Sequence, residues 1–146
     1  SALIEGDRAV CRIMECAMGN LIADAMLARV ADQGVQIAIQ NSGGIRSSID
    51  AGEVTMGEVL TVLPFQNTLS TFQVSGATIV EALENGVSQI EEVAGRFPQL
   101  AGMAYSVDAK AEFGSRTLAV SAAWQTSAMR TCSGAAANRS VTTPVE

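Results

Sequence analysis

The sequence predicts an α+β fold in which a mixed sheet packs with helices. Segments with helical apolar periodicity alternate with short β-rich runs, in the order helix, strand, helix, strand, helix, strand, strand. The length of 146 residues suits one ordinary domain, and a hydrophobic content of 48% is enough to form its core. We expect the domain to span residues 1–124. Residues 125–146 are expected to form an aberrant or disordered tail, because no periodic pattern continues after Trp124.

The first helix is predicted over residues 16–32, with Gly34 just past its end as a stop signal. Its apolar face comprises Met18, Leu21, Ile22, Ala25, Met26 and Val30. Residues 35–40 then predict a short strand, which ends in a glycine-rich loop. The residues expected on one face of this strand are Val35, Ile37 and Ile39.

The second helix is predicted over residues 55–63. Thr55 is expected to cap it, because Glu58 stands three residues on at capping-box spacing, and Pro64 ends it. Residues 68–74 predict a strand.

A third helix is predicted to begin at Ser75-Gly76, and residues 95–98 predict a turn. The apolar stripe of this helix comprises Ile79, Val80, Leu83, Val87 and Ile90. Two further strands are predicted over residues 103–107 and 118–124. In the last strand one face is expected to contain Leu118, Val120, Ala122 and Trp124.

Composition excludes several classes of function. A net charge of −6 and a pI near 4.6 argue against a nucleic-acid polymer as partner. No apolar run reaches the roughly 18 residues of a membrane span, so we expect no transmembrane segment, and no signal peptide is visible. The chain contains no histidine, which excludes imidazole-based catalysis and His-ligated metal sites. Because it starts at Ser1, we expect a fragment or a processed product. The ordinary outcome for such a composition is a binding or packing domain.

Two basic features could bind an anion. After a predicted strand, residues 41–46 (Asn-Ser-Gly-Gly-Ile-Arg) combine glycines, which allow close backbone approach, with Arg46, which could form a bidentate phosphate contact. A simple turn is the alternative. Arg8 and Arg12 precede the first helix, where a bound anion or a solvated surface would account for them.

Two further features have alternative interpretations. Phe65 could stack on a planar ring and Asn67 could hydrogen-bond its edge, or Phe65 could be a core residue that anchors a turn. Cys11 and Cys16 could form a small disulfide loop or remain free thiols; without histidine and without a CxxC motif, zinc is not expected.

Taken together, five segments in this order resemble the C-terminal domain of the 5′-nucleotidase family. Residues 11–26 look like the opening of that domain, and residues 41–46 are similar to its NSGGIR loop. Residues 63–67 are similar to its LPF-x-N segment, and residues 76–84 look like the helix ending in Leu-Glu that follows. Residues 95–102 are similar to its GRFPQ-x-x-G turn. The resemblance extends from about residue 8 to about residue 120.

The resemblance implies a division of labour. Enzymes of this family hydrolyse nucleotide phosphate esters with an N-terminal metallophosphatase domain that holds a dinuclear divalent-metal site (zinc or similar). The C-terminal domain binds the nucleoside part. This chain would therefore recognise a nucleoside monophosphate or related nucleotide in nucleotide catabolism, hold no metal or cofactor itself, and be inactive alone.

The family pattern also assigns roles to individual residues. It puts Arg12 and Arg46 on the phosphate side, with Asn41 and Gly43 lining the same pocket. Phe65 would stack on the base, and Asn67 would approach its edge. The Cys11–Cys16 pair resembles a short disulfide of the animal ecto-enzymes, which implies a secreted, extracellular, cell-surface or periplasmic location.

One departure from the family bears on function. The family continues beyond residue 124 through a second base-stacking Phe and an Asp that binds ribose, whereas residues 125–146 contain neither, so we expect a C-terminally truncated domain. The loss would weaken affinity by roughly two or more powers of ten. The alternatives are a degenerate binding or structural module, or a relative acting on UDP-sugars, cyclic nucleotides or sulfur substrates.

Overall fold

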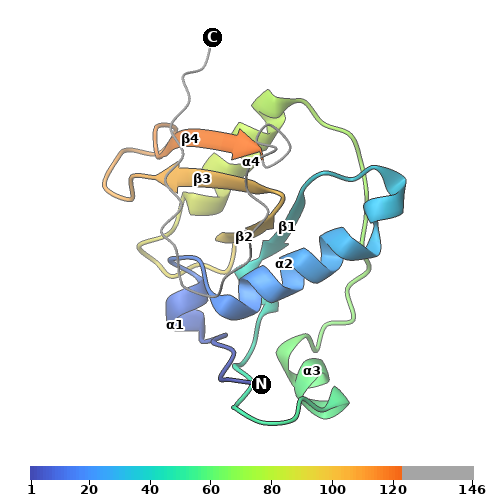
Figure 1. Cartoon of the computed structure of the whole chain (residues 1–146). Helices are drawn as coiled ribbons and strands as arrows, with labels where there is room; N and C mark the ends of the chain where they lie inside the picture. The colour runs from blue at the N-terminus through green and yellow to red at the C-terminus, as the bar shows by residue number, and fades with distance from the viewer. Residues whose placement is uncertain (123–146) are drawn as a thin grey trace.

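The computed structural model describes residues 1–122 and has the α+β architecture that the sequence predicts (Figure 1). Its helices are α1 (Arg8–Cys11), α2 (Ala17–Arg29), α3 (Met56–Val62) and α4 (Gly76–Val87), with 3₁₀ turns η1 (Ala31–Gln33) and η2 (Ser42–Gly44). Its strands are β1 (Ala38–Asn41), β2 (Pro98–Ala101), β3 (Met103–Val107) and β4 (Thr117–Ala122). The predicted end of the last strand at Trp124 and the predicted tail 125–146 lie outside the described residues.

Local capping determines where the helices begin. The Thr55 side chain accepts a hydrogen bond from the Glu58 N–H, and the Glu58 carboxylate accepts one from the Thr55 N–H at 2.8 Å, which confirms the predicted capping box of α3. Ser75 caps α4 without a reciprocal bond: its hydroxyl accepts a hydrogen bond from the Thr78 N–H at 3.2 Å. Gly34, with φ +73°, provides the left-handed stop that follows η1.

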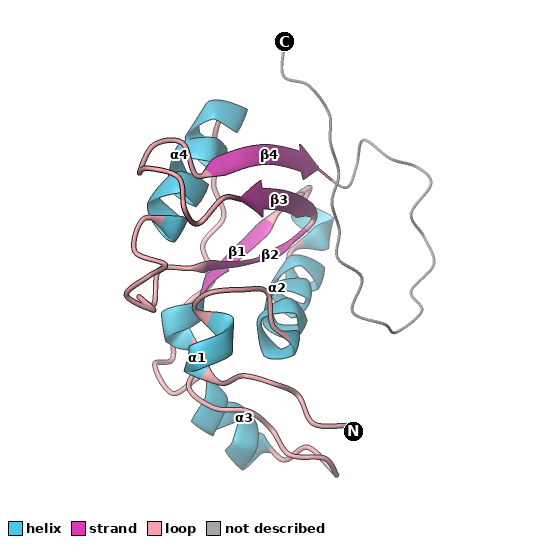
Figure 2. Cartoon of the chain, turned by 90° about the vertical axis from the view of Figure 1, so that its left-hand side faces the viewer, coloured by secondary structure: helices cyan, strands magenta, loops and turns pink. Residues whose placement is uncertain are grey.

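The described strands form two antiparallel pairs instead of one mixed sheet. β1 pairs with β2 so that Gln40 lies opposite Gln99, and β3 pairs with β4. Strand β2 and helix α1 were not predicted, since Pro98 lies in the segment interpreted as a turn and α1 is only four residues long. In two orthogonal views, α2 lies across β1 and β2, and α4 packs against β4 (Figure 2).

The apolar face predicted for β1 is not the buried one. Ile39 is 41% exposed, whereas Ala38 is buried against Ala23 of α2 and Ala101 of β2. Three alanines at this contact allow the helix to approach the sheet closely, so the small residue and not the large one faces inward. Leu21, expected on the apolar face of α2, is likewise half exposed.

The strand predicted over residues 68–74 is absent from the described structure. Residues 64–74, here called the exposed segment, run along the side of the molecule between α3 and α4 (Figure 1). They form no hydrogen bond with any other described residue, and each is exposed. The backbone N–H and C=O groups of a strand require a neighbouring strand as hydrogen-bond partner. Among residues 1–122 no strand pairs with this segment.

The hairpin of β3 and β4 is anchored to α4 by a buried carboxylate. Glu84 accepts hydrogen bonds from the backbone N–H groups of Gly114, Arg116 and Thr117 at 2.7–3.0 Å. Burial alone would raise the pKa of Glu84, but these hydrogen bonds lower it to about 2. Arg116 in turn donates to the Val87 carbonyl and forms an ion pair with Glu91. The C-terminal half of α4 is therefore fixed, whereas its N-terminal half is exposed.

Candidate functional site

Residues 41–46, here called the glycine loop, follow β1 directly. The loop is bonded to the segment before β2: the Ser42 N–H donates to the Phe97 carbonyl at 2.9 Å, and the Gly43 N–H donates to the Gly95 carbonyl at 2.7 Å. A Cβ on Gly43 would lie 2.9 Å from the Gly95 oxygen, so only glycine fits there without a shift. Ile45 is 1% exposed and anchors the loop in the core, which leaves Asn41 and Arg46 at the surface.

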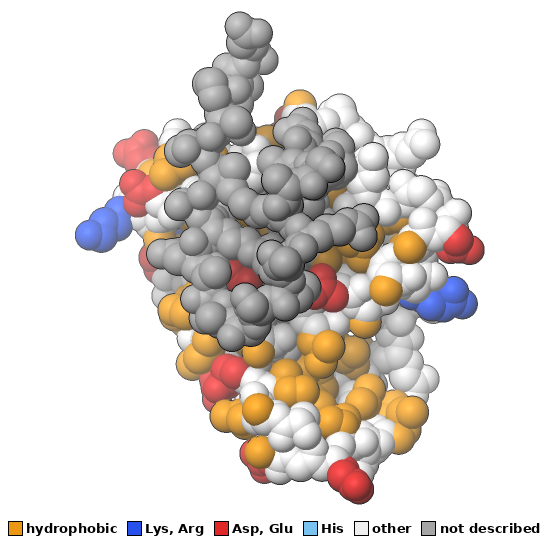
Figure 3. Space-filling model, viewed as in Figure 1, with side chains coloured by type: hydrophobic (Ala, Val, Ile, Leu, Met, Phe, Trp, Pro, Cys, Tyr) orange, Lys and Arg blue, Asp and Glu red, His pale blue; other side chains and the backbone are white. Residues whose placement is uncertain are grey.

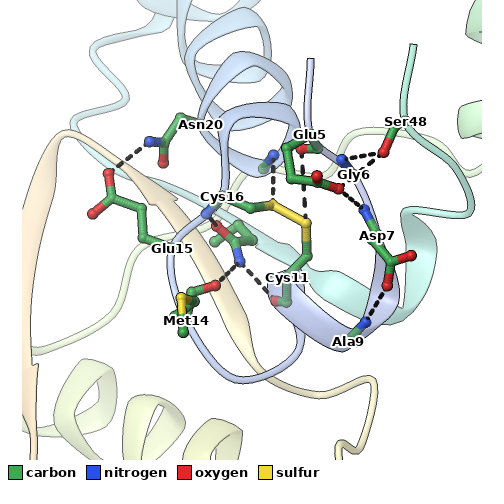
Figure 4. The surroundings of a disulfide bond; sticks show 12 residues. Glu5, Gly6, Asp7, Ala9, Cys11, Met14, Glu15, Cys16, Asn20 and Ser48 are labelled. Atoms are coloured by element: carbon green, nitrogen blue, oxygen red, sulfur yellow. Dashed lines mark hydrogen bonds between the residues drawn. A yellow bond between two sulfur atoms is a disulfide. The ribbon is translucent and has the colours of Figure 1, made fainter. Parts of the chain in front are cut away.

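Residues 11–16, here called the disulfide loop, carry Arg12. Cys11 and Cys16 are bonded to each other, as the resemblance implies, and both are buried. Figure 4 shows the disulfide with Glu5, Met14 and Ser48 around it. Arg12 follows α1, and its Nη1 donates to the Val93 carbonyl at 3.3 Å. Its Nε is buried and has no hydrogen-bond partner among the described residues.

Three arginines gather where the two loops meet. Burial lowers the pKa of Arg12, and the positive charges of Arg8 and Arg46 lower it further. Within residues 1–122 none of the three pairs with a carboxylate; the ion pair found there, Arg116–Glu91, involves other residues. Three neighbouring cations without an ion-pair partner among the described residues form a site suited to an anion. Arg8, which the resemblance left without a role, therefore belongs to this group; its spacing of four residues from Arg12 was the available signal.

Phe65 lies next to Arg46. The Arg46 guanidinium carbon is 5.6 Å from the Phe65 ring centroid, a cation–π contact that joins the exposed segment to the glycine loop. Phe65 is 57% exposed and is therefore not the core residue of the alternative interpretation. A cavity of about 190 Å³ is lined by Phe65, Asn67 and Gly44 among others. Asn67 lines this cavity without forming a hydrogen bond to a described residue.

Backbone strain coincides with the same site. In the described chain, the non-glycine residues with positive φ are Gln66 and Val93, both at +53°. Gln66 lies between Phe65 and Asn67, and the Val93 carbonyl accepts the hydrogen bond from Arg12. A left-handed conformation is costly for a β-branched residue, and such strain concentrates at functional sites.

The candidate site contains no metal centre of its own. Among the described residues no group of three or more His, Cys, Asp and Glu side chains could hold a metal ion. Nor is any helix within residues 1–122 long and apolar enough to cross a membrane.

Apolar side chains gather at the lower end of the face shown in Figure 3, where Figure 1 places α3. Met56 and Leu60 of that helix are 72% and 56% exposed.

Comparisons with known proteins agree on one family. The family model described as the 5′-nucleotidase C-terminal domain matches residues 2–130. The chain is 47% identical over 118 residues to the trifunctional nucleotide phosphoesterase protein YfkN of Bacillus subtilis, covering 80% of this chain and 8% of that protein. It is 36% identical over 125 residues to human 5′-nucleotidase, covering 79% and 22% respectively.

Solved structures give the same result. A 5′-nucleotidase precursor from Thermus thermophilus matches with a TM-score of 0.82 and 49% identity over 83% of this chain. The NAD nucleotidase NadN of Haemophilus influenzae matches with a TM-score of 0.69 and 29% identity. The chain spans less than a quarter of the length of each of these four proteins.

Proposed function

Because the chain belongs to the 5′-nucleotidase C-terminal domain family, we propose that it is the nucleotide-recognition domain of a 5′-nucleotidase-type hydrolase. The grouping of Arg8, Arg12 and Arg46, with the Arg46 guanidinium over the exposed ring of Phe65, carries this proposal. A nucleotide combines the two chemistries that such a site complements: an anionic phosphate for the guanidinium groups and a planar base for the ring. Nucleoside monophosphates are the simplest ligands with both parts.

Each site residue has a role that its position supports. Arg12 and Arg46, with Arg8 beside them, bind the phosphate through charge-assisted hydrogen bonds. Asn41 and Gly43 line the same side, since both lie against Gly95, close to the Arg12 guanidinium. On the other side, Phe65 stacks on the base and Asn67, in the adjoining cavity, hydrogen-bonds its edge.

These residues do not contain the metal site that the proposed hydrolysis requires. The 146-residue chain has no histidine, and its described residues offer no metal-binding cluster. In the proposed parent protein, an N-terminal metallophosphatase domain with a dinuclear divalent-metal site supplies the hydrolytic chemistry. This chain alone is therefore expected to show no phosphatase activity on adenosine monophosphate, with or without added zinc or manganese, in a phosphate-release assay.

A disulfide supports an oxidising location. The Cys11–Cys16 bond is buried in the core and closes the loop that carries Arg12, so the folded domain contains it as a structural element. Structural disulfides persist outside the cytosol. We therefore place the parent protein outside the cell, at the cell surface or in the periplasm.

A second candidate function, a degenerate binding or structural module, is favoured by one observation. Phe65 presents one aromatic wall from a segment that forms no hydrogen bond with other described residues. A ligand that stacks on one side only gains less than one held between two rings. Parent enzymes acting on UDP-sugars or cyclic nucleotides would use the same arginines and again offer a base to Phe65, whereas a sulfur substrate has no base to stack on that ring.

Titration by NMR with adenosine monophosphate and adenosine tests the proposal. Phe65→Ala should weaken both ligands alike, because both carry the base. Arg46→Ala should weaken the monophosphate and leave adenosine nearly unchanged, because only the monophosphate has the anion. Each loss is expected to be about 1–3 kcal/mol, the range for a stacked base or a charge-assisted hydrogen bond.

Matched controls exist on the same chain. Phe113, 66% exposed, and Arg29, exposed in the last turn of α2, should both tolerate alanine without any change in affinity. Equal losses for the two ligands with Arg46→Ala would contradict the phosphate role. An unmutated chain that shows no shift with either ligand at millimolar concentration would leave the degenerate module as the better function.

A further inference from the structure

Gln99 is a buried polar residue to which the family resemblance gave no role beyond membership of a turn motif. It lies in β2, is 1% exposed, and uses its whole carboxamide within the protein. Its Nε2 donates to the carbonyls of Cys11 at 2.8 Å and Met14 at 2.9 Å, and its Oε1 accepts from the Cys16 N–H at 3.2 Å. All three partners belong to the disulfide loop.

We propose that Gln99 is a positioning residue for Arg12 in the anion site, an inference that rests on the proposed function. The Cys11 carbonyl is part of the peptide group that joins Cys11 to Arg12. A hydrogen bond from Gln99 to that carbonyl therefore fixes the peptide plane from which the Arg12 side chain departs. The second bond, to Met14, fixes the loop on the other side of Arg12.

The disulfide cannot perform this task by itself. It joins two ends of one short loop and limits the internal freedom of that loop, but neither sulfur bonds to the sheet. Gln99 provides the connection to the sheet, because its backbone pairs with Gln40 of β1. The next residue after Gln40 is Asn41, where the glycine loop begins. One residue of β2 thus sets the distance between the loop of Arg12 and the loop of Arg46.

The neighbouring backbone is shaped around the Gln99 side chain. A Cβ on Gly19 would collide with the Gln99 carboxamide, so glycine at this position of α2 leaves the space in which Gln99 reaches the disulfide loop. In Figure 4 the carbonyl of Met14 and the backbone of Cys11 and Cys16 face the same point. A side chain buried in this way, with three hydrogen bonds to one loop, specifies the conformation of that loop.

The first test needs no ligand. Gln99→Met keeps the side-chain volume and removes all three hydrogen bonds. In this variant the Arg12 Nε–H resonance should shift and exchange with water at least about tenfold faster, since that atom is buried only while the loop is in place. The Arg46 Nε–H resonance should not move. An unchanged Arg12 signal in folded Gln99→Met protein would overturn the proposal, whether or not nucleotides bind.

The second test separates positioning from general stability. Gln99→Met should weaken adenosine monophosphate by about tenfold, the effect of losing one charge-assisted hydrogen bond, and leave adenosine unchanged. In an Arg12→Ala background the same substitution should have no further effect, because Gln99 acts through Arg12. A further loss in that background would show that Gln99 acts on the whole fold, which contradicts the proposal.

Two additional variants complete the design. Gln99→Glu keeps the size and the acceptor for Cys16. An ionised carboxylate donates no hydrogen bond and a protonated one donates a single bond, so at least one of the two carbonyls loses its donor and the variant should reproduce the Arg12 effects even if Gln99→Met does not fold. Gln33→Met, at an exposed glutamine in η1, is the matched control and should change neither resonance nor affinity. Failure of the proposed function appears as absence of nucleotide binding by the unmutated chain. Failure of this inference appears as normal Arg12 signals without Gln99.

Discussion

The two sides of the proposed nucleotide site differ in how the fold holds them. On the phosphate side, Arg12 lies in a loop closed by a disulfide and bonded to Gln99, and the glycine loop is bonded to Gly95 and Phe97. On the base side, the exposed segment forms no hydrogen bond with other described residues. The phosphate side is therefore preorganised, whereas the base side is held by its ends at α3 and α4 and by the contact of Phe65 with Arg46.

This difference predicts how binding energy is distributed. A preorganised group loses little conformational entropy when ligand binds, but a loosely held segment must be ordered at that moment. Phosphate recognition should accordingly be the stronger determinant in this chain, and base recognition the weaker one. The boundary between the two regions runs through α4, whose first half is exposed and whose second half is buried.

Core substitutions should show the largest contrast between the two regions. Ile45→Ala removes a residue of the glycine loop that is 1% exposed and should lower the free energy of unfolding by about 2–5 kcal/mol. Phe72→Ala, at a site that is 78% exposed in the exposed segment, should change it by less than about 0.5 kcal/mol. Urea unfolding followed by circular dichroism measures both. Similar losses would show that the exposed segment is packed in solution.

Removal of the disulfide should have the next largest effect. Replacing Cys11 and Cys16 by Ala should lower the free energy of unfolding by about 2 kcal/mol, the chain-entropy value for so short a loop. Hydrogen exchange should then accelerate in the disulfide loop and stay unchanged in the exposed segment. Mass spectrometry of unreduced peptide checks the bond itself; two free thiols after oxidative folding would contradict the disulfide and the extracellular location.

Acid should weaken the contact between the C-terminal half of α4 and the hairpin of β3 and β4. The hydrogen bonds to Glu84 lower its pKa from 4.5 to about 2 in the folded chain, so its carboxylate stabilises the fold above pH 4.5, and that stability is lost as the pH falls towards 2. Glu84→Gln should remove this dependence and lower the free energy of unfolding at pH 7 by about 1.5–3 kcal/mol, the range for hydrogen bonds to a charged group. Thermal unfolding between pH 2 and 7 measures both effects. Glu81→Gln, on the exposed half of α4, should leave the profile unchanged.

Relief of backbone strain should give the smallest difference in the free energy of unfolding between the two regions. Val93→Gly should raise the free energy of unfolding by about 0.5–1 kcal/mol, because glycine adopts its positive φ without cost while the surrounding hydrogen bonds hold that conformation. Gln66→Gly, in the exposed segment, should have almost no effect, because that backbone can relax. Thermal melting of the two variants provides the comparison. A larger gain at Gln66 would reverse the order of rigidity proposed for the two regions.

Several features could be predicted because they depend on neighbours in sequence. The caps Thr55 and Ser75 act within one helical turn, so α3 and α4 begin where expected. The glycine loop follows a strand as predicted, and Gly34 adopts the left-handed conformation of a stop. Motif order along the chain also indicated the family, which the comparisons confirm.

What tertiary structure alone decided depends on partners distant in sequence. Residues 68–74 have a strand-forming sequence, but a strand forms only where another strand completes its hydrogen bonds, and none does so within residues 1–122. The burial of Ala38 instead of Ile39 follows from the close approach of α2, which periodicity cannot show.

The site follows the same division. The sequence by itself determined which residue types were available: arginines and glycines for an anion, one ring for a base, and no histidine for catalysis. Only the fold decided that Arg8 belongs beside Arg12 and Arg46, and that Gln99, 88 residues from Cys11, connects their loops. Charges and hydrogen bonds act through space, so the groups that they bring together become visible only when the chain has folded.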